Sequence, residues 1–310
     1  MIERPFEAVR SACAEVAHRA RFVRIDAERL ALYADEIPLA AVREVEGPRL
    51  PEERDPETLC AFVLTLDAVN FGSGWFPFLK KRPGLSGYRT IEASLLDRFA
   101  AGGLLDCDEL SRISVRDCAD LFGQSPDDRE IAPLLELFAQ AWRDLGHTVA
   151  GSFAAFVAAC DGSAAGLVQR LLAMPLYRDI HDYDELRVPL LKRAQITAAD
   201  LHAALPETLG DFHDIDELTI FADNMVPHVL HLDGVLTLDP ALAAHIEREE
   251  QLHPGSPEEI ELRGVAVHAV EQLAERTGLL PRQLDDWLWN RGSGPEYKAI
   301  PRPRTRCPYY

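Results

Sequence analysis

Apolar residues recur along most of this chain at the three- and four-residue spacing of amphipathic helices. The clearest examples are Leu134, Phe138, Ala141, Trp142 and Leu145, and Leu262, Ala266, Ala269, Val270 and Leu273. This spacing places the apolar side chains on one face of a helix. The same pattern predicts further helices near residues 5–20, 57–69, 90–101, 152–160, 163–174, 188–204, 240–251 and 281–289. The predicted fold class is therefore mainly α.

Strand patterns are few and short. The best are RFVRID at 21–26 and GVLTLD at 234–239. Pro and Gly fall mostly between the periodic segments, and no linker is long enough to separate independent domains. We therefore predict one compact helical domain over residues 1–310, with few short strands.

The composition is that of a folded protein with a substantial core, since hydrophobic residues make up 47% of 310 residues. No apolar run is long enough to cross a bilayer, and the charged start MIERPFEAVR is unlike a signal peptide. The six cysteines include no C-x-x-C pair, which is typical of free thiols in a reducing cytoplasm. The histidines form no H-E-x-x-H motif, so we expect no metal.

The net charge of -19 excludes a long nucleic acid as the expected partner, because phosphate contacts dominate such binding. Positive charge is nevertheless concentrated in three short stretches: Lys80-Lys81-Arg82, Lys192-Arg193, and the tail from Lys298 to Arg306. Local positive charge of this kind is compatible with a small anionic ligand.

The stretch TIFADNMVPHV at 219–229 places Asp223 among apolar and uncharged residues. Desolvation of an unpaired carboxylate is costly, so this position needs an explanation. Because Pro227 lacks a backbone donor, a helix should begin near it, and Asp223 would then cap that helix. The alternative is a working carboxylate beside Phe221. Sequence physics alone favours the cap.

Two stretches in the first third of the chain have a similar ambiguity. DAVNFGSGWFPF at 67–78 offers Asn70 as a polar group and Phe71 and Trp75 as stacking surfaces, or it is a loop whose aromatic rings enter the core. LSGYRTIEA at 85–93 contains Ser86 and Tyr88, and Ser86 or Thr90 can cap a helix whose N-terminus attracts anions, although a solvated turn explains it nearly as well.

Later stretches add charged and aromatic candidates. In RVPLLKRAQITAADLHAAL at 187–205, Arg193 and Asp200 share a helix side, and Asp200 is either a buried charge or a surface carboxylate. LDDWLWNRGS at 284–293 places Asp285, Asp286, Trp289 and Asn290 close together. A carboxylate there can recognise paired N–H groups of a heterocycle, although tryptophans are more often core anchors. The tail IPRPRTRCPYY would by default be a frayed basic segment, although its two terminal tyrosines favour docking.

Together these stretches resemble the queuosine-salvage family, the queuosine 5′-phosphate N-glycosylase/hydrolases. The matching motifs are DAVNFGSGWFP, LSGYRTIEA, AGSFAAFV, LYRDIHDYDELRVPLLKRAQITAAD, TIFADNMVPHVL, ELRGVAV, LDDWLWN and IPRPRTRCPYY. They run in order from about residue 60 to Tyr310, and the series is specific although each motif is weak. The chain departs from the family pattern at Asn224-Met225, where Tyr-Arg is common, and at Asn290, where Asp is common.

The resemblance implies a fold related to helix-hairpin-helix DNA glycosylases and hydrolysis of the N-glycosidic bond of queuosine-5′-monophosphate, which releases queuine. It implies Asp223 as the leading catalytic carboxylate and Asp200 as a partner base or a ligand of the base edge. The implied substrate-binding residues are Phe221, Asn70, Phe71, Trp75, Ser86, Tyr88, Lys192, Arg193, Asp285, Asp286, Trp289, Asn290, Arg306 and Tyr310. Lys192, Arg193 and the tail arginines would bind the phosphate. Water is the second substrate, and no cofactor is required.

Two other functions remain open. One is a glycosylase that acts on another nucleoside or on nucleic acid, against which the acidic charge argues. The other is a noncatalytic helical adaptor, in which Asp223 and Asp200 would be solvated or would cap helices. We expect a cytoplasmic monomer without membrane contact, since no long apolar heptad repeat favours a coiled coil.

Overall fold

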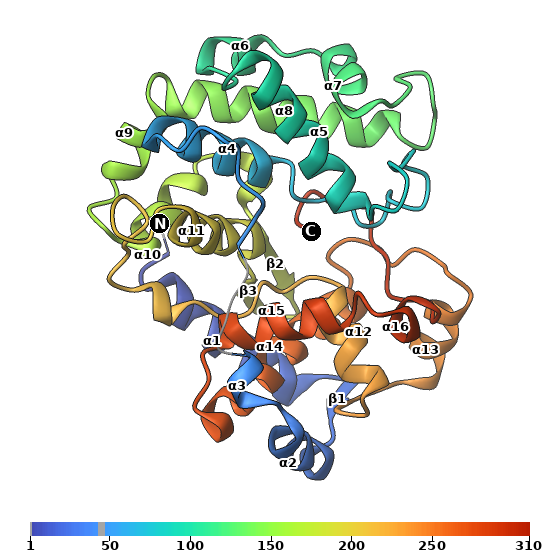
Figure 1. The fold of residues 1–310 in the computed structure, drawn as a ribbon. Coiled ribbons are helices and arrows are strands. Elements are labelled where there is room, and N and C mark those ends of the chain that lie inside the picture. Colours follow the sequence, from blue (N-terminus) through green and yellow to red (C-terminus); the bar gives the residue numbers. More distant parts are fainter. Residues whose placement is uncertain (1, 43–46) are drawn as a thin grey trace. The chain divides into compact units, whose positions relative to one another are not determined.

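The computed structural model describes residues 2–42 and 47–310 of the chain (Figure 1). Helices dominate these residues, and the strands form two small antiparallel sheets. The prediction of a mainly α fold is therefore confirmed. The contacts between Cα atoms divide the chain into two compact units, so the prediction of a single domain stays a prediction.

Unit 1 contains the described residues of 1–46 together with Asp179–Lys192 and Asp216–Arg306. Its helices are α1 (Pro5–Arg19), α2 (Ala27–Glu36), α3 (Leu39–Val42), α12 (Met225–Leu232), α13 (Pro240–Glu247), α14 (Pro257–Thr277), α15 (Pro281–Arg291) and α16 (Pro295–Lys298). Its strands are β1 (Val23–Ile25), β2 (Ile180–Tyr183), β3 (Leu186–Pro189) and β4 (Leu236–Leu238).

The core of unit 1 forms where α1 packs along α14 (Figure 1). Val9, Cys13 and Val16 are fully buried on α1. Gly264 on α14 permits this close approach, because a Cβ at that position would lie 3.2 Å from Cγ1 of Val16. Helix α14, buried from Glu259 to Val267, is therefore packed closely against α1.

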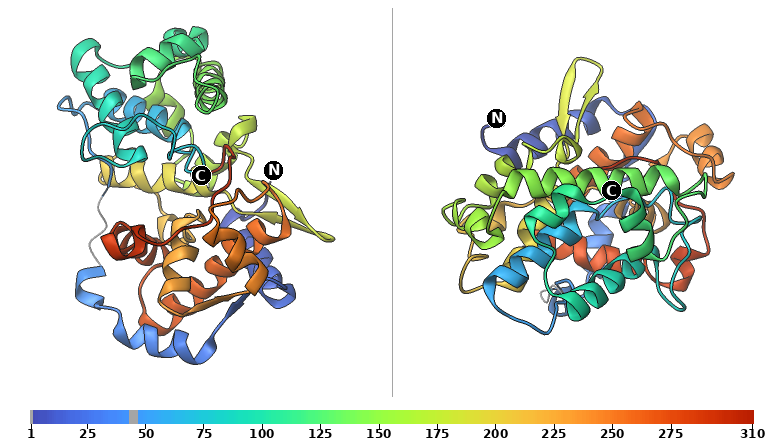
Figure 2. Two further views of the ribbon diagram at one scale, coloured as in Figure 1. Left: turned by 90° about the vertical axis from the view of Figure 1, so that its right-hand side faces the viewer. Right: turned by 90° about the horizontal axis from the view of Figure 1, so that it is seen from above.

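The two sheets of unit 1 are both antiparallel pairs of short strands. β1 and β4 lie within the two stretches predicted as strands, and they pair in the register Val23↔Leu238, which the sequence analysis did not predict. β2 pairs with β3, and Figure 2 shows these two strands side by side in yellow-green. The prediction of a helix from 188 was wrong at its start, since β3 extends to Pro189 and the helix begins only at Lys192. A turn at Asp184, which has a φ of 50°, sets up this pairing.

Unit 2 contains Gly47–Arg178, Arg193–Ile215 and Cys307–Tyr310. Its helices are α4 (Pro56–Ala68), α5 (Gly87–Gly102), α6 (Cys107–Arg112), α7 (Val115–Phe122), α8 (Ala132–Val149), α9 (Phe153–Ala158), α10 (Ala164–Leu171) and the short η1 (Pro175–Tyr177). Helix α11 (Lys192–Ala204) starts with the last residue of a unit 1 segment, and η2 (Ile215–Glu217) likewise spans a boundary between the units.

Helix α8 is the centre of unit 2 and packs against α4, α6 and α7. Its Trp142 is fully buried and donates a hydrogen bond of 2.8 Å from Nε1 to the carbonyl oxygen of Thr65 on α4. This bond satisfies the indole N–H in an apolar interior.

The six cysteines are all buried free thiols, as the sequence predicted. Within residues 2–42 and 47–310, no helix has both the length and the apolar character needed to cross a bilayer.

Candidate active site

Asp223 lies in unit 1, in the extended segment immediately before α12. Its Oδ1 accepts hydrogen bonds from the backbone N–H groups of Met225, at 2.7 Å, and Val226, at 3.2 Å. The side chain is only half-buried, and both of these hydrogen bonds go to the same oxygen, Oδ1. One oxygen therefore caps α12 while the other can act on a ligand, so the two interpretations of Asp223 are compatible.

Asp285 is buried on α15 and faces the same segment. Its Oδ1 accepts the backbone N–H of Phe221 at 2.9 Å. Burial raises the pKa of Asp285 well above its ordinary value, and the negative charge of Asp223 raises it further, while the Phe221 hydrogen bond and Lys192 lower it in part. Burial and the neighbouring Asp223 therefore both favour the protonated form of the Asp285 carboxyl.

The neighbouring residues of α15 are less enclosed than Asp285. Asp286 is half-buried, and its Oδ2 accepts a hydrogen bond of 3.1 Å from Nδ2 of exposed Asn290. Trp289 is also half-buried. Of the two adjacent carboxyl groups in LDDWLWN, Asp285 is thus the one that lies beside Asp223.

Two cations lie near the carboxyl pair. Lys192 is buried, and its charge acts on Asp285. Burial lowers the pKa of Arg302, and the charge of Asp223 raises it in part, which places this guanidinium near Asp223. Arg302 contacts Sδ of Met225 at 3.7 Å. Arg302 was not selected from the sequence, which instead led us to Arg306 among the three tail arginines.

Arg302 reaches this place because the two residues that follow it fix the tail to unit 1. Nδ2 of Asn224 donates to the carbonyl oxygen of Pro303 at 2.7 Å, and the N–H of Leu252 donates to that of Arg304 at 2.8 Å. The Arg304 guanidinium instead forms an ion pair of 3.3 Å with Glu249 on the exposed side. The prediction that the tail docks is therefore confirmed.

In unit 2, Arg193 is almost completely buried. Its guanidinium lies between the rings of Phe71 and Tyr177, with its Cζ 4.7 and 4.3 Å from their centroids. It donates to the carbonyl oxygens of Ala68, at 2.6 Å, and Leu176. Arg193 thus binds the C-terminus of α4, and its contacts are typical of an arginine that stabilises the fold.

A second group in unit 2 surrounds Tyr88 and Asp200, both half-buried. Burial raises the pKa of Tyr88 well above its ordinary value, and the charges of Asp200, Glu92 and Asp67 raise it further. The phenol is therefore protonated at neutral pH. Asp67 is fully buried, and its Oδ1 accepts a hydrogen bond of 3.1 Å from Nδ2 of Asn70. Asp67 opened the stretch DAVNFGSGWFPF and was not selected from the sequence.

The loop after α4 is fixed by aromatic burial and by the tail. Phe71 and Trp75 are buried, as expected for a loop pinned into a core. The N–H of Gly72 donates to the backbone oxygen of Tyr310 at 2.9 Å. Gly72 has a φ of 106°, which disfavours any other residue. Ser86 caps α5 by accepting the N–H of Arg89 at 3.2 Å, so that prediction is confirmed.

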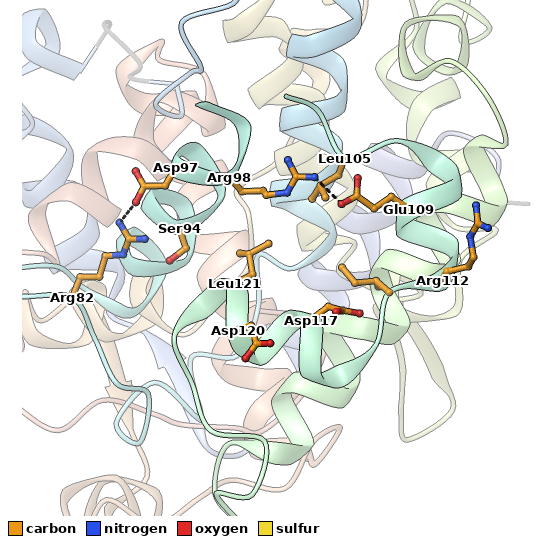
Figure 3. Close-up of a pocket in the computed structure, with 11 residues that line it drawn as sticks. Arg82, Ser94, Asp97, Arg98, Leu105, Glu109, Arg112, Asp117, Asp120 and Leu121 are labelled. Atoms are coloured by element: carbon orange, nitrogen blue, oxygen red, sulfur yellow. Dashed lines mark hydrogen bonds and ion pairs between the residues drawn. The ribbon is translucent and has the colours of Figure 1, made fainter. Parts of the chain in front are cut away.

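A pocket of about 620 Å³ lies among α5, α6 and α7 of unit 2 (Figure 3). It is lined by Arg82 of the basic stretch 80–82 but by none of the candidate site residues selected from the sequence. Figure 3 shows Arg82 paired with Asp97 and Arg98 with Glu109, each at 2.7 Å, and the third cation, Arg112, pairs with Asp108 at 3.2 Å. This pocket therefore contributes nothing to the candidate site.

The structure thus distributes the selected residues over two clusters, each described within its own unit. The unit 1 cluster contains Asp223, Phe221, Asp285, Lys192 and Arg302. The unit 2 cluster contains Asn70, Phe71, Tyr88, Arg193 and Asp200.

The residues that match known proteins include both clusters. The sequence profile of a family described as queuosine salvage protein matches residues 50–310. A Sphaerobacter thermophilus protein named queuosine 5′-phosphate N-glycosylase/hydrolase is 35% identical over 314 residues, with 95% of each chain covered. Proteins of the same name are 28% identical in Mus musculus, with 95% of this chain and 96% of the relative covered, and 31% identical in Schizosaccharomyces pombe, with 84% and 85% covered.

Proposed function

This chain belongs to the queuosine salvage protein family, and we propose that the unit 1 cluster is where it hydrolyses the N-glycosidic bond of queuosine-5′-monophosphate. In this reaction the bond between C1′ and the base nitrogen breaks, and its electron pair leaves with the base. The oxygen of water bonds to C1′, and one proton from water ends on the base. The products are queuine and ribose 5-phosphate, and no cofactor takes part.

Asp223 is the catalytic carboxylate in this proposal. The observation that carries this proposal is the difference between its two oxygens. Two backbone N–H groups fix Oδ1, which leaves Oδ2 to act on the substrate. Such a fixed negative charge stabilises the oxocarbenium-like transition state, and it can accept a proton from the attacking water. Because the Asp223 side chain is already held in place, it does not have to change rotamer during the reaction.

Asp285 acts on the leaving base as a neutral group. Its Oδ1 is occupied by Phe221, so the carboxyl O–H donates from Oδ2 to an acceptor on the base. This hydrogen bond stabilises the negative charge that develops on the base as the glycosidic bond breaks. It replaces the expectation of a carboxylate that accepts two hydrogen bonds.

Lys192 and Arg302 bind the 5′-phosphate in this proposal. Both lie near the carboxyl pair, and cations there offset the charge of an anionic substrate on a chain with a net charge of -19. Arg193 is assigned a structural role because its donors bind carbonyl oxygens. Asp200 remains the second candidate for the acid–base group, with Tyr88 as its neighbour. The roles of Trp289, Asn290 and Arg306 stay predictions.

The remaining functions are less well supported. An adaptor would not need a neutral carboxyl beside a carboxylate, and its relatives would not be named as hydrolases. A polymeric nucleic acid would be repelled by the acidic chain. We place the reaction in the cytoplasm and expect a monomer, and the six free thiols support the location.

The test is release of queuine by the purified protein, measured by mass spectrometry. Queuosine-5′-monophosphate and unphosphorylated queuosine are supplied separately. The proposal predicts faster release from the phosphate. No release from either compound by folded protein would contradict it.

A further inference from the structure

A buried arginine on α14 contacts the backbone directly beside Asp223. Arg263 is 1% exposed, and its Nε donates to the carbonyl oxygen of Ala222 at 2.8 Å. Its other two nitrogens form a two-point contact with Asp179, from Nη1 to Oδ1 at 3.1 Å and from Nη2 to Oδ2 at 2.6 Å. The planar guanidinium thus fixes two segments at once, with directions set by its geometry.

Asp179 in turn fixes the residues that lead into α11. Its Oδ2 also accepts the backbone N–H of Lys192 at 3.1 Å. Its carbonyl oxygen accepts the N–H groups of Leu190, at 2.9 Å, and Leu191, at 3.3 Å. Leu191 has a φ of 55°, a left-handed conformation that a branched side chain adopts only when its surroundings impose it. The hydrogen bonds to Asp179 hold Leu191 in this conformation and so determine the position of Lys192.

The chemistry of this ion pair indicates that it fixes the local geometry rather than adding to the stability of the fold. Asp179 is 2% exposed, and although burial alone would raise its pKa, Arg263 and His181 hold that pKa well below its usual range. Buried ion pairs contribute little net stability because desolvation offsets their attraction, whereas the geometry that they impose is strict. Arg263 lies in the motif ELRGVAV and Asp179 in LYRDIHDYDELRVPLLKRAQITAAD, and the proposed reaction assigns neither residue a role.

We propose that Arg263 and Asp179 are positioning residues that hold Asp223 and Lys192 in register with each other. The proposal rests on the assignment of Asp223 as the catalytic carboxylate. Arg263 acts on Asp223 through the Ala222 carbonyl, and Asp179 acts on Lys192 through its backbone N–H. Neither side chain contacts substrate.

Arg263→Lys tests this inference, with Glu259→Gln as the matched control. A lysine can keep one bond to Asp179 but cannot also donate to the Ala222 carbonyl. Glu259 lies one turn earlier on α14. Its Oε1 pairs with Nη1 of Arg263 at 3.1 Å, and its Oε2 accepts the backbone N–H of Gly255 at 3.2 Å. Its loss therefore perturbs the same buried cation while the bonds to Ala222 and Asp179 remain.

We expect Arg263→Lys to lower kcat at least about 10-fold, with KM for queuosine-5′-monophosphate changed less than about 3-fold. Both substitutions disturb the same buried cation, so Glu259→Gln should lower Tm about as much as Arg263→Lys does. It should leave kcat unchanged. Wild-type kcat in folded Arg263→Lys would overturn the proposal, and so would an equal loss of kcat in Glu259→Gln.

A second variant keeps the proposal testable if Arg263→Lys does not fold. Asp179→Asn retains an acceptor for the Lys192 N–H but cannot hold both Nη atoms, so its kcat should also fall, and wild-type kcat in folded Asp179→Asn would overturn the proposal. Asp223→Asn is measured alongside. An active Asp223→Asn would contradict the function assigned to Asp223, which is a different result from a wild-type kcat in the Arg263 variant.

Discussion

The backbone N–H of Phe221 donates a hydrogen bond of 2.9 Å to Oδ1 of Asp285. This bond joins the segment before α12 to α15 and brings the second carboxyl group beside Asp223. It also occupies one oxygen of Asp285, so that only Oδ2 remains for a ligand. The carboxyl groups of Asp285 and Asp223 therefore lie side by side, and our proposal assigns them different functions.

The first prediction concerns the neutral form of Asp285. An asparagine is also neutral, accepts the Phe221 N–H and donates from its amide, so Asp285→Asn should retain kcat within about 10-fold. Asp285→Ala removes the donor and should lower kcat about 100-fold or more. Steady-state queuine release measures both. Equal losses in the two variants would contradict the hydrogen-bonding role.

The second prediction is a pH dependence of stability. The folded-state pKa of Asp285 lies above its unfolded value, so the folded protein binds the extra proton and its free energy of unfolding falls as pH rises between the two values. One such group changes the free energy of unfolding by at most about 1.4 kcal/mol per pH unit.

Urea denaturation of wild type and Asp285→Asn over a pH series isolates this contribution. The wild type should lose stability relative to Asp285→Asn as pH rises above the ordinary carboxyl range. A difference that is constant with pH, or that changes in the other direction, would show that Asp285 is not held neutral.

The third prediction separates the arginines of the tail. Arg302→Ala should raise KM for queuosine-5′-monophosphate about 10- to 100-fold, because a hydrogen bond to a charged group contributes about 1.5–3 kcal/mol. The activity on unphosphorylated queuosine should change little. Arg304→Ala is the control, since its guanidinium pairs with Glu249 on the exposed side. An equal effect of both substitutions would argue against a phosphate site at Arg302.

The fourth prediction concerns Arg193. Its buried guanidinium binds carbonyl oxygens at the end of α4, so Arg193→Ala should lower the free energy of unfolding of the protein by about 3 kcal/mol or more. Arg116→Ala, at an exposed position of α7 in the same unit, should change it by less than about 0.5 kcal/mol. Chemical denaturation measures both values. A stable Arg193→Ala with a raised KM would instead restore a phosphate-binding role.

The helical part of the fold follows from local pattern. The predicted helices near 5–20, 57–69 and 281–289 correspond closely to α1, α4 and α15, because each is rich in apolar residues at helical spacing and begins at a proline. The hairpin of β2 and β3 was missed because each strand has only four residues. The turn at Asp184 and the hydrogen bonds from Leu190 and Leu191 to the Asp179 carbonyl oxygen define it, and neither is marked by a glycine or a proline in the turn.

The candidate site was predictable in its residue types but not in its protonation states or partners. Asp223 was conspicuous because a charge stood alone among apolar residues. The raised pKa of Asp285 depends on burial and on Asp223, and the two residues are 62 positions apart. Likewise, the positions of Arg302 and Arg263 depend on neighbours distant in sequence. The contacts of Arg193 with carbonyl oxygens were not apparent from a sequence context that suggested phosphate.

The most direct test of the central claim is the rate of queuine release from queuosine-5′-monophosphate by Asp223→Asn, with Asp200→Asn measured under the same conditions. Asn keeps an acceptor for the N–H groups of Met225 and Val226 but removes the charge that the transition state requires. We predict a loss of kcat of at least about 1000-fold in folded Asp223→Asn, with a smaller loss in Asp200→Asn. Near wild-type release by Asp223→Asn, with release abolished in Asp200→Asn, would contradict the assignment and transfer the catalytic role to Asp200.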